Sequence, residues 1–476
     1  MPAPPLRVEP SAASLAAGLD RIRAELEVPG AFPPEAAGEA EDAARRGPAP
    51  DAGRRDRTAL SLVTIDPPGS RDLDQALLIE RRGDGHRVRY AIADVASLVP
   101  PGGAVDREAR ARGVTLYLPD RRTPLHPEVL GEGAASLLPG EDRPALLWTI
   151  DLDASGEAVA VELERATVRS RAALAYAQAQ ERIDAGTADE PLAPLREVGE
   201  RRLAREAARG GVSLSVPAQA IERDGAGYRL RYEFPLPVER WNAQVSLLTG
   251  ICAARIMIDG GVGLFRVLAA PEEAALAGLR RSAAALGVPW PADRSYPDVV
   301  RALDPANPGH AAFAVRASRL FRGAGYRAWT RAAGDPPPPH AAIAAPYAHV
   351  TAPLRRMADR VANEVVLALS RGQEPPAWAL EALPDMPDVM SRARARERAA
   401  ERLALDYLES VLLAGRVGEV FEATVVDVRD DRPVVQIADP AVVAGLDARG
   451  PRPGERLRVR LAEADPEARR VVFTRS

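Results

Sequence analysis

Three aspartates, Asp66, Asp72 and Asp74, lie within nine residues of one another in the stretch TIDPPGSRDLDQAL. A mostly apolar run over 60–65 precedes them and the apolar pattern resumes over 76–79, which predicts a turn held between two strands. Carboxylates crowded in this way raise one another's pKa unless a cation neutralises them. Magnesium, which prefers oxygen ligands and shares carboxylates with substrate phosphates, is such a cation. A solvated turn is the alternative interpretation, because aspartate also favours turns and caps.

A second group of candidates lies in PYAHVTAPLRRMADR, Pro346–Arg360, where Arg355 and Arg356 stand at the start of a predicted helix. Cations are unfavourable at a helix N-terminus unless an anion approaches it. The pair therefore favours contact with a phosphate, and the alternative is two arginines that face solvent. His349 in this segment, and His126 upstream, fit a hydrogen-bonded structural role better than that of a ligand.

The candidate residues must be positioned by strands and helices, which the apolar periodicity of the sequence predicts. Predicted strands cover Leu60–Asp66, Val88–Asp94, Ala145–Asp153 and Ala158–Val168, with a hairpin turn at 153–156. Predicted helices cover Ala12–Leu26, Ala172–Ile183, Arg196–Ala208, Val238–Ile258, Pro271–Leu286, Arg355–Ser370 and Val389–Leu413. Alternating strands at Val420–Val428, Pro433–Ile437, Arg456–Leu461 and Arg470–Thr474 predict a small closed barrel at the C-terminal end. The segment GPAPDAGRRDR, 47–57, is predicted to be a polar linker after a helical start.

Length, composition and net charge limit the number of domains and the ways in which the chain could bind nucleic acid. At 476 residues the chain should hold two to four domains, since a domain averages about 100–200 residues. Every basic side chain other than histidine is arginine, which coding bias explains first, although arginine also binds phosphate in a bidentate manner. The net charge of −4 argues against binding nucleic acid through a broad positive field, but it allows a local basic channel.

The same composition bears on the compartment. The single cysteine, Cys252, lies in an apolar run and is expected to be a core residue in a reducing compartment. The N-terminal residues have no basic region followed by an apolar core, and no apolar segment is long enough to span a bilayer. We therefore expect a cytoplasmic protein with no membrane partner.

The candidate residues sit in four segments that resemble a known family. The acidic turn is followed by VTLYLPDRRTPLHPEVL at Val114–Leu130, SLLPGEDRPAL at Ser136–Leu146 and the PYAHVTAPLRRMADR segment. In this order and at these separations they resemble the catalytic RNB domain of the ribonuclease II and ribonuclease R family, over roughly residues 60–413. The resemblance implies a magnesium-dependent, processive 3'-to-5' exoribonuclease that releases nucleoside 5'-monophosphates, with manganese as a substitute ion. It also implies a monomer whose partner is RNA with a single-stranded 3' end.

The resemblance assigns roles to individual residues. The family's acidic motif has four aspartates; the first three match Asp66, Asp72 and Asp74, and Gln75 occupies the fourth position. The resulting assignments are Asp74, Arg355 and Asp72 as catalytic residues, Asp66, Asp72, Asp74 and Gln75 as metal ligands, and Tyr117, Tyr176 and Arg356 as RNA-binding residues. Tyr117 matches a tyrosine that stacks on terminal bases, although a half-buried strand aromatic is the alternative. An amide at Gln75 brings no charge, so metal affinity and rate are expected to be lower.

The resemblance also implies the domain plan. We expect a mixed α/β (α+β) catalytic domain at residues 56–415 between a small helical N-terminal module at 1–55 and an OB-fold RNA-binding barrel at 416–476. The N-terminal residues are too few for the two cold-shock barrels common in the family. Phe421 is the one early aromatic in the barrel, and it is either a stacking residue or core.

Two other functions stay open. The chain can be a catalytically weakened RNA-binding protein of RNB descent, which Gln75 favours. It can also be a metal-dependent phosphodiesterase for small nucleotides, in which case affinity would not rise with RNA length.

Overall fold

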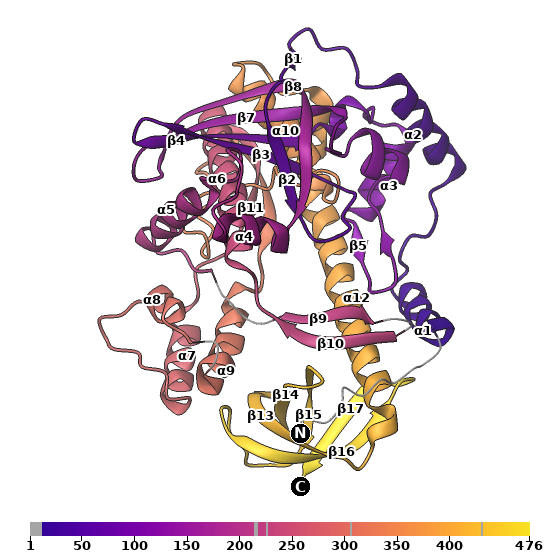
Figure 1. The fold of residues 1–476 in the computed structure, drawn as a ribbon, viewed down its shortest axis with the longest axis vertical. Coiled ribbons are helices and arrows are strands. Elements are labelled where there is room, and N and C mark those ends of the chain that lie inside the picture. Colours follow the sequence, from indigo (N-terminus) through magenta and orange to yellow (C-terminus); the bar gives the residue numbers. More distant parts are fainter. Residues whose placement is uncertain (1–11, 214–217, 225–226, 305–306, 430–431) are drawn as a thin grey trace.

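The structure is a computed structural model that describes residues 12–213, 218–224, 227–304, 307–429 and 432–476. A mixed α/β body and a C-terminal barrel lie at opposite ends of the molecule, and the long helix α12 (Met386–Leu413) runs from one to the other (Figure 1). This arrangement confirms the predicted fold class. Residues 1–11, which carry the prediction about a leader, lie outside the described residues.

The body is built on a six-stranded sheet in the order β1-β8-β2-β3-β4-β7. Its strands are β1 (Arg55–Asp56), β2 (Leu62–Asp66), β3 (Gln75–Arg82), β4 (Gly85–Ala93), β7 (Asp142–Leu152) and β8 (Ala158–Ala175). The first part of β8 pairs antiparallel with β7 and its last part pairs parallel with β2, so the strands close on themselves. The four predicted strands are confirmed, and the acidic turn lies between β2 and β3 as expected.

Strands β2, β4 and β7 are buried over most of their length, with a core on each face of the sheet, which explains why these strands are mostly apolar. Ile65 and Trp148 point into a core that they share with α6 and α10, whereas Leu62 and Leu147 point into a core that they share with α2 and α3. The covering helices are α2 (Pro34–Arg46), α3 (Ala104–Arg112), α6 (Pro237–Gly260) and α10 (Met357–Ser370). Cys252 is buried in α6, which confirms its expected place in the core.

Two predictions about this body are wrong in detail. The predicted helix over 172–183 begins later, at Tyr176, because Ala172–Leu174 continue β8 and pair with β2. Tertiary pairing here overrides the helix propensity of alanine. The predicted polar linker is docked on the body: β1 joins the sheet, and Asp51 pairs with Arg165 at 3.3 Å.

The remaining elements complete the body. The other α-helices of the described chain that follow β8 are α4 (Tyr176–Asp184), α5 (Leu195–Ala208), α7 (Glu273–Ala285), α8 (Tyr296–Arg301), α9 (Pro308–Ala317) and α11 (Ala377–Ala382). Three small strand pairs join them: β5 (Leu116–Tyr117) with β6 (Arg122–Thr123), β9 (Ala218–Asp224) with β10 (Gly227–Glu233), and β11 (Val262–Val267) with β12 (Gly325–Thr330). The first of these pairs carries Tyr117.

The C-terminal strands form the predicted closed barrel, in the order β13-β14-β15-β17-β16. They are β13 (Val420–Arg429), β14 (Arg432–Ile437), β15 (Val442–Asp447), β16 (Arg456–Asp465) and β17 (Arg470–Arg475). Only β15 has no counterpart in the sequence prediction. Phe421 is buried and meets Phe473 edge to face at 5.9 Å, so the core alternative for this ring is the right one. No helix within the described residues is long and apolar enough to cross a membrane.

Candidate active site

The acidic turn is braced by the segment SLLPGED. The Ser136 hydroxyl accepts a hydrogen bond from the backbone N–H of Leu73 at 2.9 Å and donates to the carbonyl of Arg71 at 2.6 Å. The N–H of Leu137 donates to the carbonyl of Leu73 at 3.0 Å. These bonds fix the backbone of the turn, and with it the directions in which Asp72 and Asp74 point.

Asp74 is the most buried acid of the turn, with 3% of its surface exposed. Its Oδ1 accepts the backbone N–H of Leu354 at 2.7 Å, and its Oδ2 lies 3.2 Å from Nε of Arg355. Burial raises the pKa of Asp74 to about 8, even though the Arg355 charge and the Leu354 N–H act in the opposite direction. The carboxyl group is therefore short of positive charge.

Asp66, at the end of β2, lies in the same acidic turn as Asp74. Its Oδ2 is buried and has no hydrogen-bond partner. Burial raises the pKa of Asp66 to about 6; the Arg355 charge lowers it and the Asp72 charge raises it further. A buried carboxylate oxygen without a partner is costly, so a cation at this position would be stabilising.

Asp72 is already engaged by protein groups. The Tyr117 hydroxyl donates to its Oδ2 at 2.6 Å, and Arg122 donates to its Oδ1 at 3.1 Å. Arg122 also forms an ion pair with Glu132. The sequence assignments omit Arg122, although it lies in the motif LYLPDRR together with Tyr117 and its position there could have indicated a role at the site.

Gln75 is engaged at both ends of its amide. Its Nε2 donates to the carbonyl of Thr351 at 2.5 Å, and its Oε1 accepts the hydroxyl of Tyr90 at 3.1 Å. The residue thus ties β3 to the segment that carries Arg355. Its assignment as a metal ligand stays a prediction.

The two arginines of the motif differ in their surroundings. The side chain of Arg355 is 45% exposed and contacts Asp74. Its charge also lowers the pKa of Asp66. Arg356, the N-cap residue of α10, makes two hydrogen bonds of 2.8 Å to Asp359, whose Oδ1 also accepts the backbone N–H of Ala352. Arg355 is therefore open to a substrate phosphate, while the guanidinium of Arg356 has an internal partner that holds the loop.

The tyrosines and histidines fall into two groups. Tyr117 is 47% exposed, and Tyr176 follows directly on Ala175, the residue paired with Asp66, so both flank the acids.

His349 places Nδ1 2.6 Å from the hydroxyl of Tyr326, and burial holds its pKa well below the ordinary value. His126 is also buried, and its Nε2 lies 3.3 Å from the carbonyl of Pro353. The two histidines are structural, as the sequence favours.

The residues present fit a magnesium ion. In the described part of the chain, no three or more His, Cys, Asp or Glu side chains gather closely enough to form a complete metal cage. Magnesium does not need one, because it keeps several waters and is usually held by one or two carboxylates together with substrate phosphates. Asp66, with a raised pKa and an unpartnered Oδ2, and Asp74, with a raised pKa, are the two carboxylates that suit this role.

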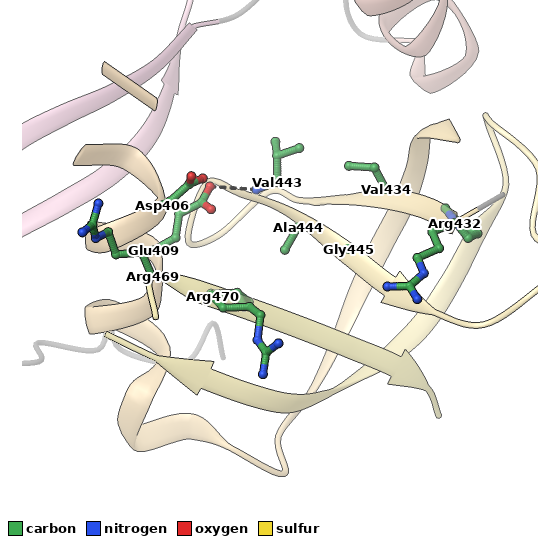
Figure 2. A pocket seen from close by; sticks show the side chains of 11 residues that line it. Asp406, Glu409, Arg432, Val434, Val443, Ala444, Gly445, Arg469 and Arg470 are labelled. Carbon is green, nitrogen blue, oxygen red and sulfur yellow. Dashed lines mark hydrogen bonds between the residues drawn. The ribbon is translucent and has the colours of Figure 1, made fainter. Parts of the chain in front are cut away.

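A separate concavity lies where α12 meets the barrel. It is a groove of about 600 Å³ lined by acids of α12 and arginines of the barrel, among them Glu409, Arg432 and Arg470 (Figure 2). Oε1 of Glu409 accepts the N–H of Val443 at 2.9 Å and Nε2 of Gln219 at 2.6 Å, and burial raises the pKa of Glu409 to about 7. None of the candidate active-site residues lines this groove.

Comparisons with known proteins match two regions of the chain to described domains. Residues 54–372 match the RNB domain, and residues 419–476 match the RNase II-type exonuclease C-terminal S1 domain. Ribonuclease R of Escherichia coli (strain K12) is 29% identical over 404 residues, which cover 79% of this chain and 48% of that protein. The chain spans about half the length of the curated relatives it matches.

Solved structures share the fold. Mycoplasma genitalium RNase R in complex with ribose-methylated single-stranded RNA has a TM-score of 0.86 at 20% identity, covering 97% of this chain and 78% of that one. Yeast Ssd1, a pseudonuclease, has a TM-score of 0.67 at 19% identity, covering 84% and 52%. Because the RNB match covers more than half of the chain and the S1 match follows it, the chain belongs to the RNB domain family.

Proposed function

We propose that the protein is a magnesium-dependent, processive 3'-to-5' exoribonuclease that releases nucleoside 5'-monophosphates. The observation that carries the proposal is the convergence of Asp66, Asp74 and Arg355, with Tyr117 alongside, from three separate segments of the chain. The names of the relatives, ribonuclease R among them, and the RNA in the related structure support RNA as the substrate.

Each residue has a chemical task in this proposal. Asp66 and Asp74 hold the divalent ion, which when bound supplies charge neutralisation at the phosphate and a more acidic water. Arg355 donates to the oxygens of the scissile phosphate and stabilises the charge that develops there. Tyr117 presents its ring to a terminal base, a contact that tolerates every base because each has a π-face. Asp72 holds the hydroxyl of Tyr117 and orients that ring.

The rival proposal is a catalytically weakened RNA-binding protein. It is favoured by the acidic motif, in which Gln75 is uncharged and Asp72 is engaged by Tyr117 and Arg122. Asp66 and Asp74 are then left to hold metal, and Asp74 already pairs with Arg355. The pseudonuclease named above has the same fold, and the fold therefore does not decide between the two functions.

One experiment separates the proposals. The purified protein is incubated with a 3'-labelled oligoribonucleotide and Mg²⁺, beside an Asp74→Asn variant. Release of labelled mononucleotide by the wild type, and its loss in the variant with RNA binding retained, is the expected result. Tight RNA binding without mononucleotide release would instead establish the rival, and affinity independent of RNA length would indicate a phosphodiesterase for small nucleotides.

A further inference from the structure

Helix α1 (Ala12–Glu25) packs against the hairpin that carries Tyr117. Leu19 and Ile22 of α1 belong to the same buried cluster as Leu116 and Leu118 of the hairpin. Successive side chains of a strand point to opposite faces, so Tyr117, between these leucines, points away from α1. That opposite face is the one on which its hydroxyl meets Asp72.

The tip of the hairpin is pinned to α1 by charge. Arg23 is 8% exposed and makes two hydrogen bonds to Asp120, at 2.9 Å and 2.5 Å, and a third to the carbonyl of Arg121 at 3.2 Å. Asp20, one turn earlier on α1, pairs with Arg121 at 2.5 Å. A bidentate arginine–carboxylate contact fixes orientation as well as distance.

The other side of the hairpin is bound to the active site. Arg122 follows the pinned tip directly and donates to Asp72 at 3.1 Å. The chain of contacts therefore runs from Arg23 through Asp120 to the two residues, Tyr117 and Arg122, that hold Asp72.

Helix α1 is itself fixed to two other parts of the molecule. Gly18 lies so close to Tyr407 of α12 that a Cβ at this position would come within 2.0 Å of the ring. Glu25, the last residue of α1, pairs with Arg469 of the barrel. Helix α1 is thus held at its middle by α12 and at its C-terminal residue by the barrel, and the hairpin packs on it.

We propose that Arg23 is a positioning residue, which sets the Tyr117 ring over the acidic turn and so determines how the last nucleotides of RNA are held. This inference rests on the proposed function and deepens it, because it gives the N-terminal helix a part in substrate binding. Arg23 itself touches neither substrate nor metal; it acts through the hairpin.

The test uses the full chain and a 5'-labelled oligoribonucleotide. In Arg23→Ala and in Asp120→Asn, KM should rise about tenfold, which corresponds to about 1.4 kcal/mol and lies near the low end of what hydrogen bonds to charged groups contribute. The change in kcat should be less than about twofold. The shortest product should lengthen. Arg23→Lys keeps the positive charge but loses the bidentate guanidinium contact, so its KM should lie between those of the wild type and Arg23→Ala. Arg45→Ala, which removes an exposed ion pair on α2, is the matched control and should behave as the wild type.

A double-mutant experiment distinguishes positioning of the Tyr117 ring from a general structural role of Arg23. In a Tyr117→Ala background the ring is gone, so adding Arg23→Ala should have no further effect on KM or product length. Arg23→Ala that lowers kcat equally in both backgrounds would overturn the inference, since the helix would then be merely structural. If Arg23→Ala fails to fold, Asp120→Asn decides, because it leaves the apolar contacts of α1 intact.

A binding readout keeps the two proposals apart. In the Asp74→Asn background, an RNA that ends in 2-aminopurine should lose fluorescence on stacking against Tyr117, and Arg23→Ala should diminish that loss. A wild type that releases no mononucleotide would refute the proposed function alone. A wild type that is active, with Arg23→Ala and Asp120→Asn indistinguishable from Arg45→Ala in KM and quenching, would refute this inference alone.

Discussion

The affinity of the acidic turn for a divalent ion should depend steeply on pH, and Asp74 should be the reason. Without an ion, burial gives Asp74 a pKa of about 8 and Asp66 a pKa of about 6. An ion that binds the ionised carboxylates must displace whatever protons they carry. Affinity therefore rises as the pH rises through these values, and it levels off above them.

The magnitude follows from the two pKa values. At pH 6, Asp74 is ionised in about one molecule in 100 and Asp66 in about half; at pH 8 these fractions are about one half and nearly all. The apparent affinity should therefore increase about 100-fold from pH 6 to pH 8, or about 2.7 kcal/mol. In Asp74→Asn only Asp66 still titrates, so the increase should shrink to about twofold.

The assay is a titration with Mn²⁺ in which the free ion is followed by electron paramagnetic resonance at several pH values. Asp72→Asn is the control, because Tyr117 and Arg122 already engage that carboxylate, and it should keep the steep dependence. An affinity that does not change with pH in the wild type, or an equally steep change in Asp74→Asn, would refute the reasoning.

Other predictions concern the parts that support the site. The raised pKa of Glu409 means that its contribution to stability is present below about pH 4.5 and is lost as the pH rises through about 7. Glu409→Gln should remove this loss and raise the free energy of unfolding at pH 8 by up to about 3 kcal/mol, measured by thermal unfolding between pH 5 and 8; a variant with the wild-type pH dependence would contradict it. Arg360→Met should destabilise the protein by about 3 kcal/mol in chemical denaturation, because Asp106 would lose its buried partner; a change as small as that of Arg45→Ala would count against this. Gln75→Asp restores the family's fourth acid, for which the motif alone predicts a higher rate, but it also removes the donor to the Thr351 carbonyl. We expect the lost hydrogen bond to dominate and kcat/KM to fall; a large increase would mean that Gln75 weakens catalysis.

Local patterns predict much of this fold because they report local causes. The apolar run before Asp66 identified β2, and the Asp153-Ser155-Gly156 turn was identified by residue types that stabilise it: Oδ1 of Asp153 accepts the backbone N–H groups of Ser155 and Glu157. Alternation alone predicts the closed barrel. Such features need no knowledge of distant residues.

The features that sequence reasoning missed depend on long-range contacts. Whether Ala172 belongs to a strand or a helix is decided by its pairing with Val63. That Gln75 reaches the Thr351 carbonyl, and that Arg122 reaches Asp72, follows from how separate segments meet. Spacing along the chain predicts the candidate acids, but it does not distinguish Asp72, which Tyr117 and Arg122 engage, from Asp66, whose Oδ2 has no partner.

We propose that Asp66 and Asp74 hold a divalent ion beside Arg355. Anomalous diffraction from crystals soaked in Mn²⁺ tests it most directly. We predict one peak within coordination distance of both carboxylates. Absence of a peak there, or a peak bound by Asp72 and Gln75 in place of Asp66 and Asp74, would contradict the claim.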